Sequence, residues 1–306
     1  MTWWEAIVLG VVQGLTEFFP VSSSGHLVMA QHMLGLSLPG IGFEVVVHIA
    51  TLISVLVVYR SRVWKLCRGC IGLEEESAWP YVMKLVLATI PAAIIGLAFE
   101  DWFEARFEDP AFTGTMLLVT GMLVWSSRWV RETRMPQVNE LLPFLGAALA
   151  AFLFGHVAGF IAVALLLGAV FLIARLTTHA DWRPEPTWGG ALMMGIAQAC
   201  AILPGVSRSG STVIAGLWRR IDPVAAAEFS FLMSIPAILG AAILALPDLA
   251  AEGSTISAVP LALGFIASGV AGVLAIRWFV ALLARQNFHV FAYYCWAAAT
   301  LFLITL

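Results

Sequence analysis

The sequence predicts an all-α polytopic membrane protein with two inverted-topology repeats, each a re-entrant helix-loop-helix followed by three transmembrane helices, and an extra apolar hairpin between the repeats. Three observations predict this fold class: the composition, the spacing and flanking charges of the apolar stretches, and an internal repeat. Of the 306 residues, 61% are hydrophobic and 11% are charged, and the mean hydropathy is +0.93. Because a soluble domain is usually about 25% charged, this composition indicates a membrane protein.

The charge balance and the motifs exclude two classes of ligand. The formal net charge of −3 offers no basic surface, and no motif for binding DNA or RNA is present, so nucleic acid is not expected as a partner. A P-loop nucleotide enzyme is excluded because the pattern GxxxxGK[ST] does not occur.

Six apolar stretches are long enough to cross about 30 Å of hydrocarbon at about 1.5 Å per residue. They run over residues 43–59, 84–99, 112–127, 225–246, 259–276 and 289–306. A further apolar run at 141–176 is interrupted by FGHVAG, and its halves are short for full spans, so we predict a hairpin there. The chain then divides into repeat one at 1–140, the inserted hairpin with its loop at 141–187, and repeat two at 188–306.

The lysine and arginine residues predict the orientation in the membrane. They gather in short loops, notably at 60–68, 128–134 and 218–220, whereas residues 1–59 contain none. Since short basic loops stay on the cytoplasmic side, we expect these loops in the cytoplasm and the N-terminal segment outside. The run at 141–176 has basic residues on both flanks, so it must cross an even number of times, as a hairpin does.

An internal repeat appears when the sequence is compared with itself at an offset of 185 positions. Ala6–Ala30 aligns with Ala191–Ala215 without a gap, and nine of the 25 pairs are identical. Three predicted spans follow each copy, so copy one starts outside and copy two starts in the cytoplasm, which makes the repeats inverted. Inverted repeats bring broken helices together around a polar site near the middle of the membrane.

Each copy carries helix breakers at the same place. Pro20 and Pro204 precede a loop of serine and glycine, after which a helix resumes. We therefore predict a re-entrant helix-loop-helix at about 3–36 and another at about 188–218. Irregular backbone at membrane depth is tolerated where it is buried in protein or lines a wet cavity, so the two loops are candidates to meet in one site.

The first copy contains a carboxylate and the second an arginine. Gln13 and Glu17 are four residues apart and share one helix face. An ionisable residue at membrane depth costs about 2.5 kcal/mol or more and is usually functional, although Glu17 could instead be a structural partner for Arg208. The planar guanidinium of Arg208 suits phosphate oxygens.

The loop residues around them are candidates for anion binding and catalysis. Ser23 could be a nucleophile, and His26 could be a nucleophile, a general base or a structural helix cap, so both roles remain open. His48 follows Glu44 at helical spacing and could support residues that contact the substrate without contacting it itself. The hydroxyls and amides at the two helix N-termini predict a substrate-binding set of Ser22, Ser24, Gly25, Ser207, Ser209 and Gly210.

Four motifs occur in a fixed order: QGLTEFFPVSSSGH at 13–26, FEVVVH at 43–48, PGVSRSG at 204–210 and AEFSFLMSIP at 227–236. In these motifs the chain resembles the undecaprenyl-pyrophosphate phosphatase family, also called bacitracin-resistance proteins. The resemblance implies hydrolysis of undecaprenyl diphosphate to undecaprenyl phosphate and inorganic phosphate, which recycles the lipid carrier of cell-wall synthesis. It also implies a multi-pass protein of the bacterial cytoplasmic membrane, a site that opens toward the periplasm, membrane lipid as surroundings, and a homodimer.

The resemblance also implies roles for single residues. Glu17 corresponds to the catalytic or metal-associated carboxylate, Ser23 and His26 to the nucleophile or base, and Arg208 to the diphosphate clamp. The implied cofactor is a divalent cation, Mg²⁺ or alternatively Ca²⁺, with Glu17 and Gln13 as ligands. The first acidic position of the family's (Glu/Gln)-xxx-Glu motif is Gln13 here, which adds no charge, so we expect weaker metal affinity.

Two other functions compete with hydrolysis. A transporter or flippase for a prenyl-phosphate lipid would use the same phosphate-binding loops, since inverted repeats with broken helices are typical of carriers. Such a carrier has no need of an acid, a nucleophile and a base in one cluster. A type-2 phosphatidic acid phosphatase is rejected because that family needs a histidine six residues after the arginine, where this chain has Ile214.

Overall fold

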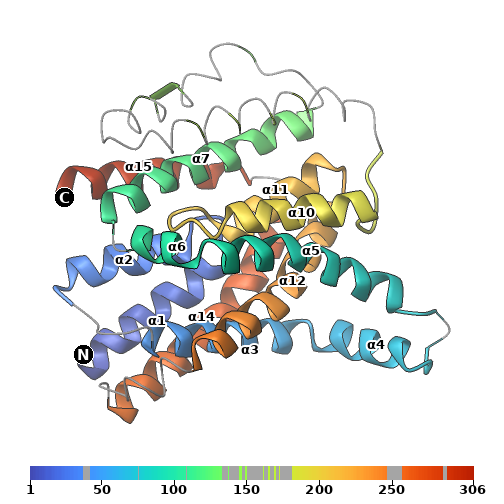
Figure 1. Cartoon of the computed structure of the whole chain (residues 1–306), viewed down its shortest axis with the longest axis horizontal. Helices are drawn as coiled ribbons and strands as arrows, with labels where there is room; N and C mark the ends of the chain where they lie inside the picture. The colour runs from blue at the N-terminus through green and yellow to red at the C-terminus, as the bar shows by residue number, and fades with distance from the viewer. Residues whose placement is uncertain are drawn as a thin grey trace.

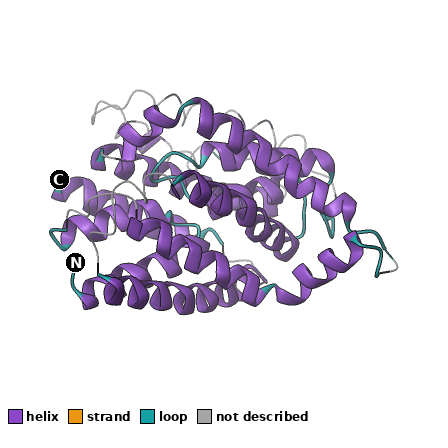
Figure 2. Ribbon diagram, turned by 60° about the horizontal axis from the view of Figure 1, so that its bottom comes forward, coloured by secondary structure: helices purple, strands orange, loops and turns teal. Residues whose placement is uncertain are grey.

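A computed structural model describes residues 1–36, 42–74, 76–107, 109–132, 181–246, 257–284 and 288–306, together with isolated positions between 137 and 172. Within these ranges the chain forms twelve helices and, besides them, one isolated β-bridge between Arg183 and Ile221 (Figures 1 and 2). The prediction of an all-α fold is confirmed. The predicted hairpin at 141–176 lies outside the described residues, apart from the isolated positions.

The first repeat region contains seven of the helices. They are α1 (Trp3–Phe18), α2 (Ser23–Met33), α3 (Gly42–Val58), α4 (Arg60–Cys70), α5 (Trp79–Ala98), α6 (Glu100–Phe107) and α7 (Pro110–Glu132). The second region contains the other five. They are α10 (Trp188–Cys200), α11 (Arg208–Trp218), α12 (Pro223–Leu244), α14 (Ala258–Ala284) and α15 (Val290–Thr305).

The helix ends follow from local side chains. Thr2 and Glu5 form a capping box at the start of α1, with the Thr2 N–H donating to the Glu5 carboxylate at 2.6 Å. Asp222 caps α12 by accepting from two backbone N–H groups, and a proline occupies the first helical position. α1 ends two residues before Pro20, whose ring cannot continue a helix. Each copy contains two helices joined by a loop, α1 and α2 in the first copy and α10 and α11 in the second.

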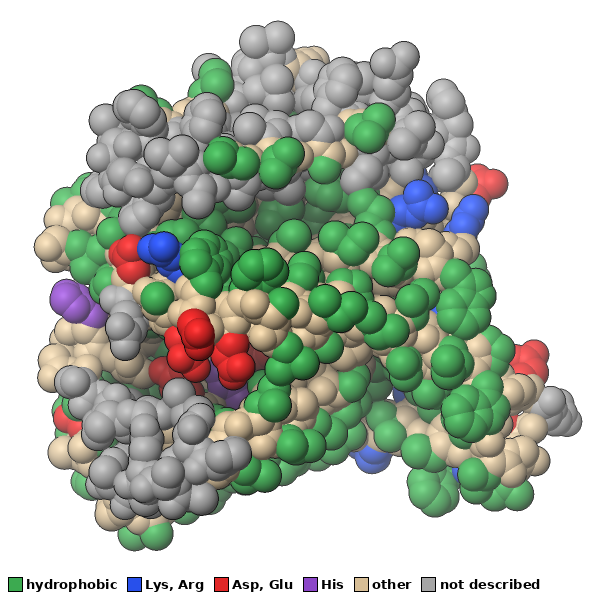
Figure 3. Space-filling view, viewed as in Figure 1, with side chains coloured by type: hydrophobic (Ala, Val, Ile, Leu, Met, Phe, Trp, Pro, Cys, Tyr) green, Lys and Arg blue, Asp and Glu red, His purple; other side chains and the backbone are tan. Residues whose placement is uncertain are grey.

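Each of the six predicted transmembrane stretches coincides with a helix, namely α3, α5, α7, α12, α14 and α15. Among the described residues, α5, α12 and α14 are long and apolar enough to cross a membrane unaided. α3 and α4 together form a further candidate span that bends by 77° at Tyr59, and α15 is a shorter apolar helix. The chain is therefore a multi-pass membrane protein, in keeping with the hydrophobic surface in Figure 3.

The two copies pack against each other's helices. α1 runs along α14 and α10 runs along α5, while α7 and α15 lie side by side at the top of Figure 1. Glycine allows the close approach in both pairs. A Cβ atom on Gly10 would lie 2.4 Å from the Gly264 carbonyl oxygen, and one on Gly195 would lie 2.4 Å from the Ala88 carbonyl oxygen. Gly10 and Gly195 are one of the identical pairs of the repeat, so both copies use this glycine in the same way.

We expect Gly195→Ala to destabilise the protein by about 1–3 kcal/mol, because the new methyl group would clash with the backbone of Ala88, which cannot move away as a flexible side chain could. Thermal unfolding in detergent measures this. Gly240→Ala is the matched control, since a Cβ atom there meets nothing within 4 Å and alanine favours helix over glycine. Equal melting temperatures for the two variants would contradict the tight α10–α5 contact.

The loops between the paired helices contact each other reciprocally. A Cβ atom on Gly25 would lie 3.5 Å from the Gly205 Cα atom, and one on Gly210 would lie 3.1 Å from the Pro20 Cβ atom. At the offset of 185, Gly25 corresponds to Gly210 and Pro20 to Gly205. The contact therefore occurs twice with the roles of the copies exchanged, as in a two-fold symmetric interface.

The same reciprocity holds for the loop carbonyl groups. The Gly205 oxygen accepts a hydrogen bond from the Thr120 hydroxyl of α7 at 2.7 Å. The Pro20 oxygen accepts one from the Cys295 thiol of α15 at 3.5 Å. Each irregular loop thus has a buried donor for an otherwise unpaired carbonyl, which is what backbone at membrane depth requires.

Candidate active site

The two loops border one cavity of about 430 Å³. One side of this cavity is polar, with two carboxylates, an arginine, several hydroxyls and a histidine. Its other side is apolar and includes the second half of α12. The polar lining consists of Glu17, Ser22, Ser23, Ser24, Glu44, His48, Ser207 and Arg208. Figure 3 shows acidic side chains with a histidine set deeper beside them, within a largely hydrophobic face.

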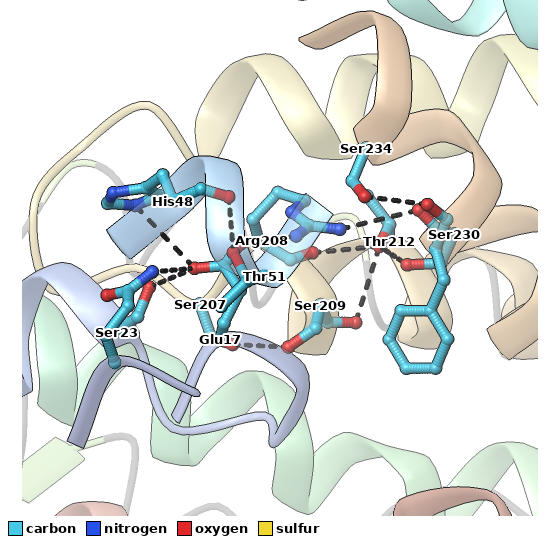
Figure 4. A network of polar contacts seen from close by, with 12 residues as sticks. Glu17, Ser23, His48, Thr51, Ser207, Arg208, Ser209, Thr212, Ser230 and Ser234 are labelled. Atoms are coloured by element: carbon cyan, nitrogen blue, oxygen red, sulfur yellow. Dashed lines mark hydrogen bonds and ion pairs between the residues drawn. The ribbon is translucent and has the colours of Figure 1, made fainter. Parts of the chain in front are cut away.

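Glu17 is the centre of the polar side. Its Oε1 atom pairs with the Arg208 guanidinium at 2.5 Å, and its Oε2 atom accepts hydrogen bonds from the Ser23 hydroxyl at 2.6 Å and the Gln13 amide at 3.0 Å. The side chains of Glu17 and Arg208 are only 7% and 16% exposed. The structure thus brings together residues 191 positions apart, as Figure 4 shows. Breaking a buried ion pair by removing one partner is usually strongly destabilising.

Arg208 is held in place from α12 and from its own helix. A guanidinium N–H donates to the Ser230 carbonyl oxygen at 3.4 Å. The Thr212 hydroxyl donates to the Arg208 carbonyl oxygen at 2.8 Å and lies 2.6 Å from the Ser230 hydroxyl (Figure 4). Sequence reasoning missed Thr212 and Ser230. The position of Thr212 four residues after Arg208 could have indicated the first of them, since such residues are neighbours on a helix.

Ser22 and Ser207 are the N-caps of α2 and α11. The hydroxyl of each accepts from the backbone N–H three residues later, at Gly25 (3.4 Å) and Gly210 (3.1 Å). Ser22 has a positive φ of 66°, which is unusual for a residue other than glycine. The equivalent serines therefore make the same local bond in both copies.

The predicted substrate-binding residues divide into two groups. Ser22, Ser24 and Ser207 line the cavity, whereas Gly25, Ser209 and Gly210 do not. Ser209 is buried, and its hydroxyl donates to the Phe19 carbonyl oxygen at 2.9 Å. The second group shapes the loops and does not face the cavity.

His26 is buried and is not among the residues that line the cavity. Its Nδ1 atom lies 2.8 Å from the Ser22 carbonyl oxygen, and its Nε2 atom lies 2.8 Å from the Tyr294 hydroxyl of α15. The two rings also stack, with centroids 5.5 Å apart. Both imidazole nitrogens are therefore engaged within the protein, and the position fits the structural alternative that the sequence left open.

His48 is the histidine that faces the cavity. Its side chain is 32% exposed, and its Nε2 atom lies 3.8 Å from the Glu17 Oε2 atom (Figure 4). Sequence reasoning placed it behind the site because Glu44 lies one helical turn earlier. The contact depends on how α3 packs beside the first loop, which no local pattern of the sequence reveals.

The residues offer an incomplete set of metal ligands. In the part of the chain that the structure describes, no three His, Cys, Asp or Glu side chains gather closely enough to hold an ion. However, the Gln13 Oε1 atom is buried without a hydrogen-bond partner, while the Nε2 atom of the same amide donates to the Glu17 carboxylate. Turning the amide over would place this oxygen beside Glu17. Mg²⁺ is commonly held by one or two carboxylates together with substrate phosphates, so one carboxylate and one free amide oxygen fit a cation that arrives with a phosphate ligand.

Comparisons with known proteins identify the family of this chain. The model of the family described as "Bacitracin resistance protein BacA" matches residues 6–156 and 141–301. An undecaprenyl-diphosphatase of Desulfatibacillum aliphaticivorans is 33% identical over 99% of this chain and 99% of its own length. One of Halothermothrix orenii is 34% identical over 98% and 96%, and undecaprenyl-diphosphatase 3 of Bacillus anthracis is 32% identical over 98% and 96%. With matches of this extent and identity, the chain belongs to the bacitracin resistance protein BacA family.

Proposed function

We propose that this protein hydrolyses undecaprenyl diphosphate to undecaprenyl phosphate and inorganic phosphate at the cavity between the two loops. One observation carries the proposal: a single buried carboxylate, Glu17, accepts the Ser23 hydroxyl on one oxygen and pairs with Arg208 on the other. A nucleophile beside a base, with a phosphate-binding fork next to both, is the arrangement that phosphoryl transfer needs. The relatives named as undecaprenyl-diphosphatases support the choice of substrate.

The cavity suits the two ends of such a lipid. Arg208 and the first backbone N–H groups of α11 offer positive charge to the diphosphate, as helix N-termini commonly do. The apolar side, to which α12 and its C-cap contribute between Ala237 and Ala245, suits the prenyl chain where it leaves the diphosphate. The rest of the prenyl chain extends into the surrounding lipid.

In the first step, the Ser23 Oγ atom attacks the terminal phosphorus and the bond to the bridging oxygen breaks. Undecaprenyl phosphate leaves with that oxygen, and the hydroxyl proton moves to the Glu17 Oε2 atom, 2.6 Å away. Arg208 shifts its hydrogen bonds from Glu17 to the phosphate oxygens and stabilises the charge that develops there. Of the two candidates for nucleophile, Ser23 is favoured because it lines the cavity and His26 does not.

In the second step, water attacks the phosphorus and the bond to Oγ breaks. One proton of the water returns to the Ser23 Oγ atom through Glu17, and the other stays on the released phosphate. Before this second step begins, Glu17 gives the proton that it took from Ser23 to the departing lipid phosphate. The same carboxylate can therefore accept a proton in both steps. Catalysis then consists mainly of positioning and charge stabilisation.

A divalent cation, Mg²⁺ or Ca²⁺, fits this site with Glu17 and the Gln13 amide oxygen as ligands. When bound, it neutralises charge on the diphosphate oxygens. Gln13 carries no charge, so we propose weak binding of the cation before the diphosphate arrives. Mg²⁺ keeps few protein ligands when substrate phosphates complete its shell.

The reciprocal contacts of the loops support inverted repeats with two re-entrant helix-loop-helix elements. The same-side position of the two termini and of α2, away from the basic helix α4 in Figure 1, supports a cytoplasmic position for α4 and a cavity that opens toward the periplasm. A homodimer stays a prediction, since it follows from the resemblance alone.

The test is phosphate release from a C55 isoprenyl diphosphate by the purified protein in detergent. We expect release that stops with a chelator and resumes when Mg²⁺ is restored. A soluble nucleoside diphosphate at the same concentration should release far less phosphate, because it cannot fill the apolar side of the cavity. Intact folding is checked by thermal unfolding under the same conditions.

The outcome also separates the enzyme from a carrier. Folded protein that binds the lipid and releases no phosphate, with or without Mg²⁺, would contradict hydrolysis. The lipid transporter would then be the better explanation of the two phosphate-binding loops.

A further inference from the structure

The surroundings of the Glu17 Oε2 atom contain more than a nucleophile. Three polar groups converge on this oxygen: the Ser23 hydroxyl at 2.6 Å, the Gln13 amide at 3.0 Å and the His48 Nε2 atom at 3.8 Å. Each of them can also present a lone pair. A hydroxyl rotates, an amide exchanges its N and O positions by turning over, and a neutral imidazole has one bare nitrogen. Such a set can surround either a carboxylate alone or a carboxylate with a cation.

The imidazole of His48 is already oriented for metal binding. Its Nδ1 atom lies 2.7 Å from the Glu44 carbonyl oxygen, one turn earlier on α3. A carbonyl can only accept, so Nδ1 carries the hydrogen and Nε2 presents its lone pair toward Glu17 and the cavity. A histidine that binds a metal almost always donates its other N–H to a carbonyl or carboxylate in this way.

The amide of Gln13 gives an independent indication. Gln13 is completely buried, and its Oε1 atom has no hydrogen-bond partner although its Nε2 atom donates to Glu17. Leaving a buried acceptor unpaired costs about 1–3 kcal/mol. When the amide turns over, the free oxygen takes the place beside Glu17, where a cation would satisfy it.

We propose that His48 is a ligand of the divalent cation, through Nε2, together with Glu17 and the Gln13 amide oxygen. The remaining positions are filled by water and, on the proposed function, by diphosphate oxygens. This makes a mixed nitrogen and oxygen site. Imidazole favours later transition metals, whereas all-oxygen sites suit Mg²⁺ and Ca²⁺, so His48 shifts the preference of the site toward ions such as Co²⁺.

His26 cannot take this role in place of His48. Both of its nitrogens are engaged, by Ser22 and by Tyr294, at 2.8 Å each. Glu44 lines the cavity, but its carboxylate accepts from the Gln31 amide at 3.2 Å. Its backbone oxygen orients His48 instead.

The experiment measures binding of Co²⁺ and of Mg²⁺ to the purified protein in detergent, without lipid substrate. We compare wild type, His48→Gln and His32→Gln, using calorimetry for affinity and the visible absorption of Co²⁺ for its ligands. His32 is a matched control because it is an exposed histidine of α2 that does not line the cavity.

In His48→Gln, an amide oxygen replaces the imidazole nitrogen. We expect Co²⁺ affinity to fall at least about tenfold, a loss seen even when a residue that merely orients a ligand is changed. Mg²⁺ affinity should stay within about threefold, because this ion prefers oxygen. The Co²⁺ absorption bands should shift in His48→Gln and match wild type in His32→Gln.

Three results would overturn the proposal: no Co²⁺ binding by wild type, equal losses for Co²⁺ and Mg²⁺ in His48→Gln, or an unchanged Co²⁺ spectrum in that variant. Phosphate release from the C55 lipid is recorded separately with wild type. A protein that shows the change in ion preference and releases no phosphate would refute hydrolysis alone. One that releases phosphate without the change in preference would refute the role of His48 alone.

Discussion

Arg208→Lys should lower kcat/KM for the C55 diphosphate by about 10³-fold, the lower range for loss of an arginine that stabilises a phosphoryl-transfer transition state. The guanidinium bridges the Glu17 carboxylate and the Ser230 carbonyl, so its planar fork is fixed before substrate arrives. Lysine keeps the positive charge but places it at one point, and it cannot donate two parallel hydrogen bonds. Steady-state phosphate release measures the loss.

Arg219→Lys is the matched control for this change. Arg219 follows the end of α11 and does not line the cavity. Both variants keep the net charge, so a difference between them reflects the geometry at Arg208. Activity of Arg208→Lys within about threefold of wild type would show that positive charge alone is enough. The two parallel hydrogen bonds of the guanidinium would then not be needed for the reaction.

Ser23→Ala should lower kcat by about 10⁴-fold or more, as removal of a catalytic nucleophile commonly does. The lipid should still bind, because Arg208 and the N-terminus of α11 remain in place. The neighbouring hydroxyl provides the control. Ser24 also lines the cavity, but its hydroxyl lies 3.3 Å from Ser22 and makes no bond to Glu17 that would activate it. Ser24→Ala should keep kcat within about tenfold.

His26→Gln separates the two candidate nucleophiles in the same assay. If Ser23→Ala retained most of its activity and His26→Gln lost it, the attack would have to be reassigned to His26. That outcome would require the His26 ring to leave both Ser22 and Tyr294 during the reaction.

Much of the fold could be predicted because membrane helices leave strong local signals. The breakers Pro20 and Pro204 correctly placed the two loops, and the apolar stretches correctly placed six helices. The repeat predicted that the loops would meet, and the pairing of Glu17 with Arg208 confirms that they do. Low charge content and long apolar segments limit the structures a chain can adopt in lipid.

The remaining features depend on packing between distant helices. The sequence could not distinguish His26 from His48, because which imidazole faces the cavity depends on how α3 and α15 lie beside the first loop. The support of Arg208 by Ser230 is likewise a contact between α11 and α12 that no spacing rule contains. Residues on separate helices meet through tertiary geometry, and periodicity reports only one helix at a time.

The reciprocal contacts of Gly25 with Gly205 and of Gly210 with Pro20 bear on how such a site could have arisen. A half-length ancestor that paired with an antiparallel copy of itself would have carried the same residue at both loop positions that now hold Ser23 and Arg208. With identical loops it could have presented two attacking groups or two cationic groups, but not one of each. Once the halves are fused into one chain, each loop can mutate separately. One loop can then carry the nucleophile and the other the arginine that binds phosphate.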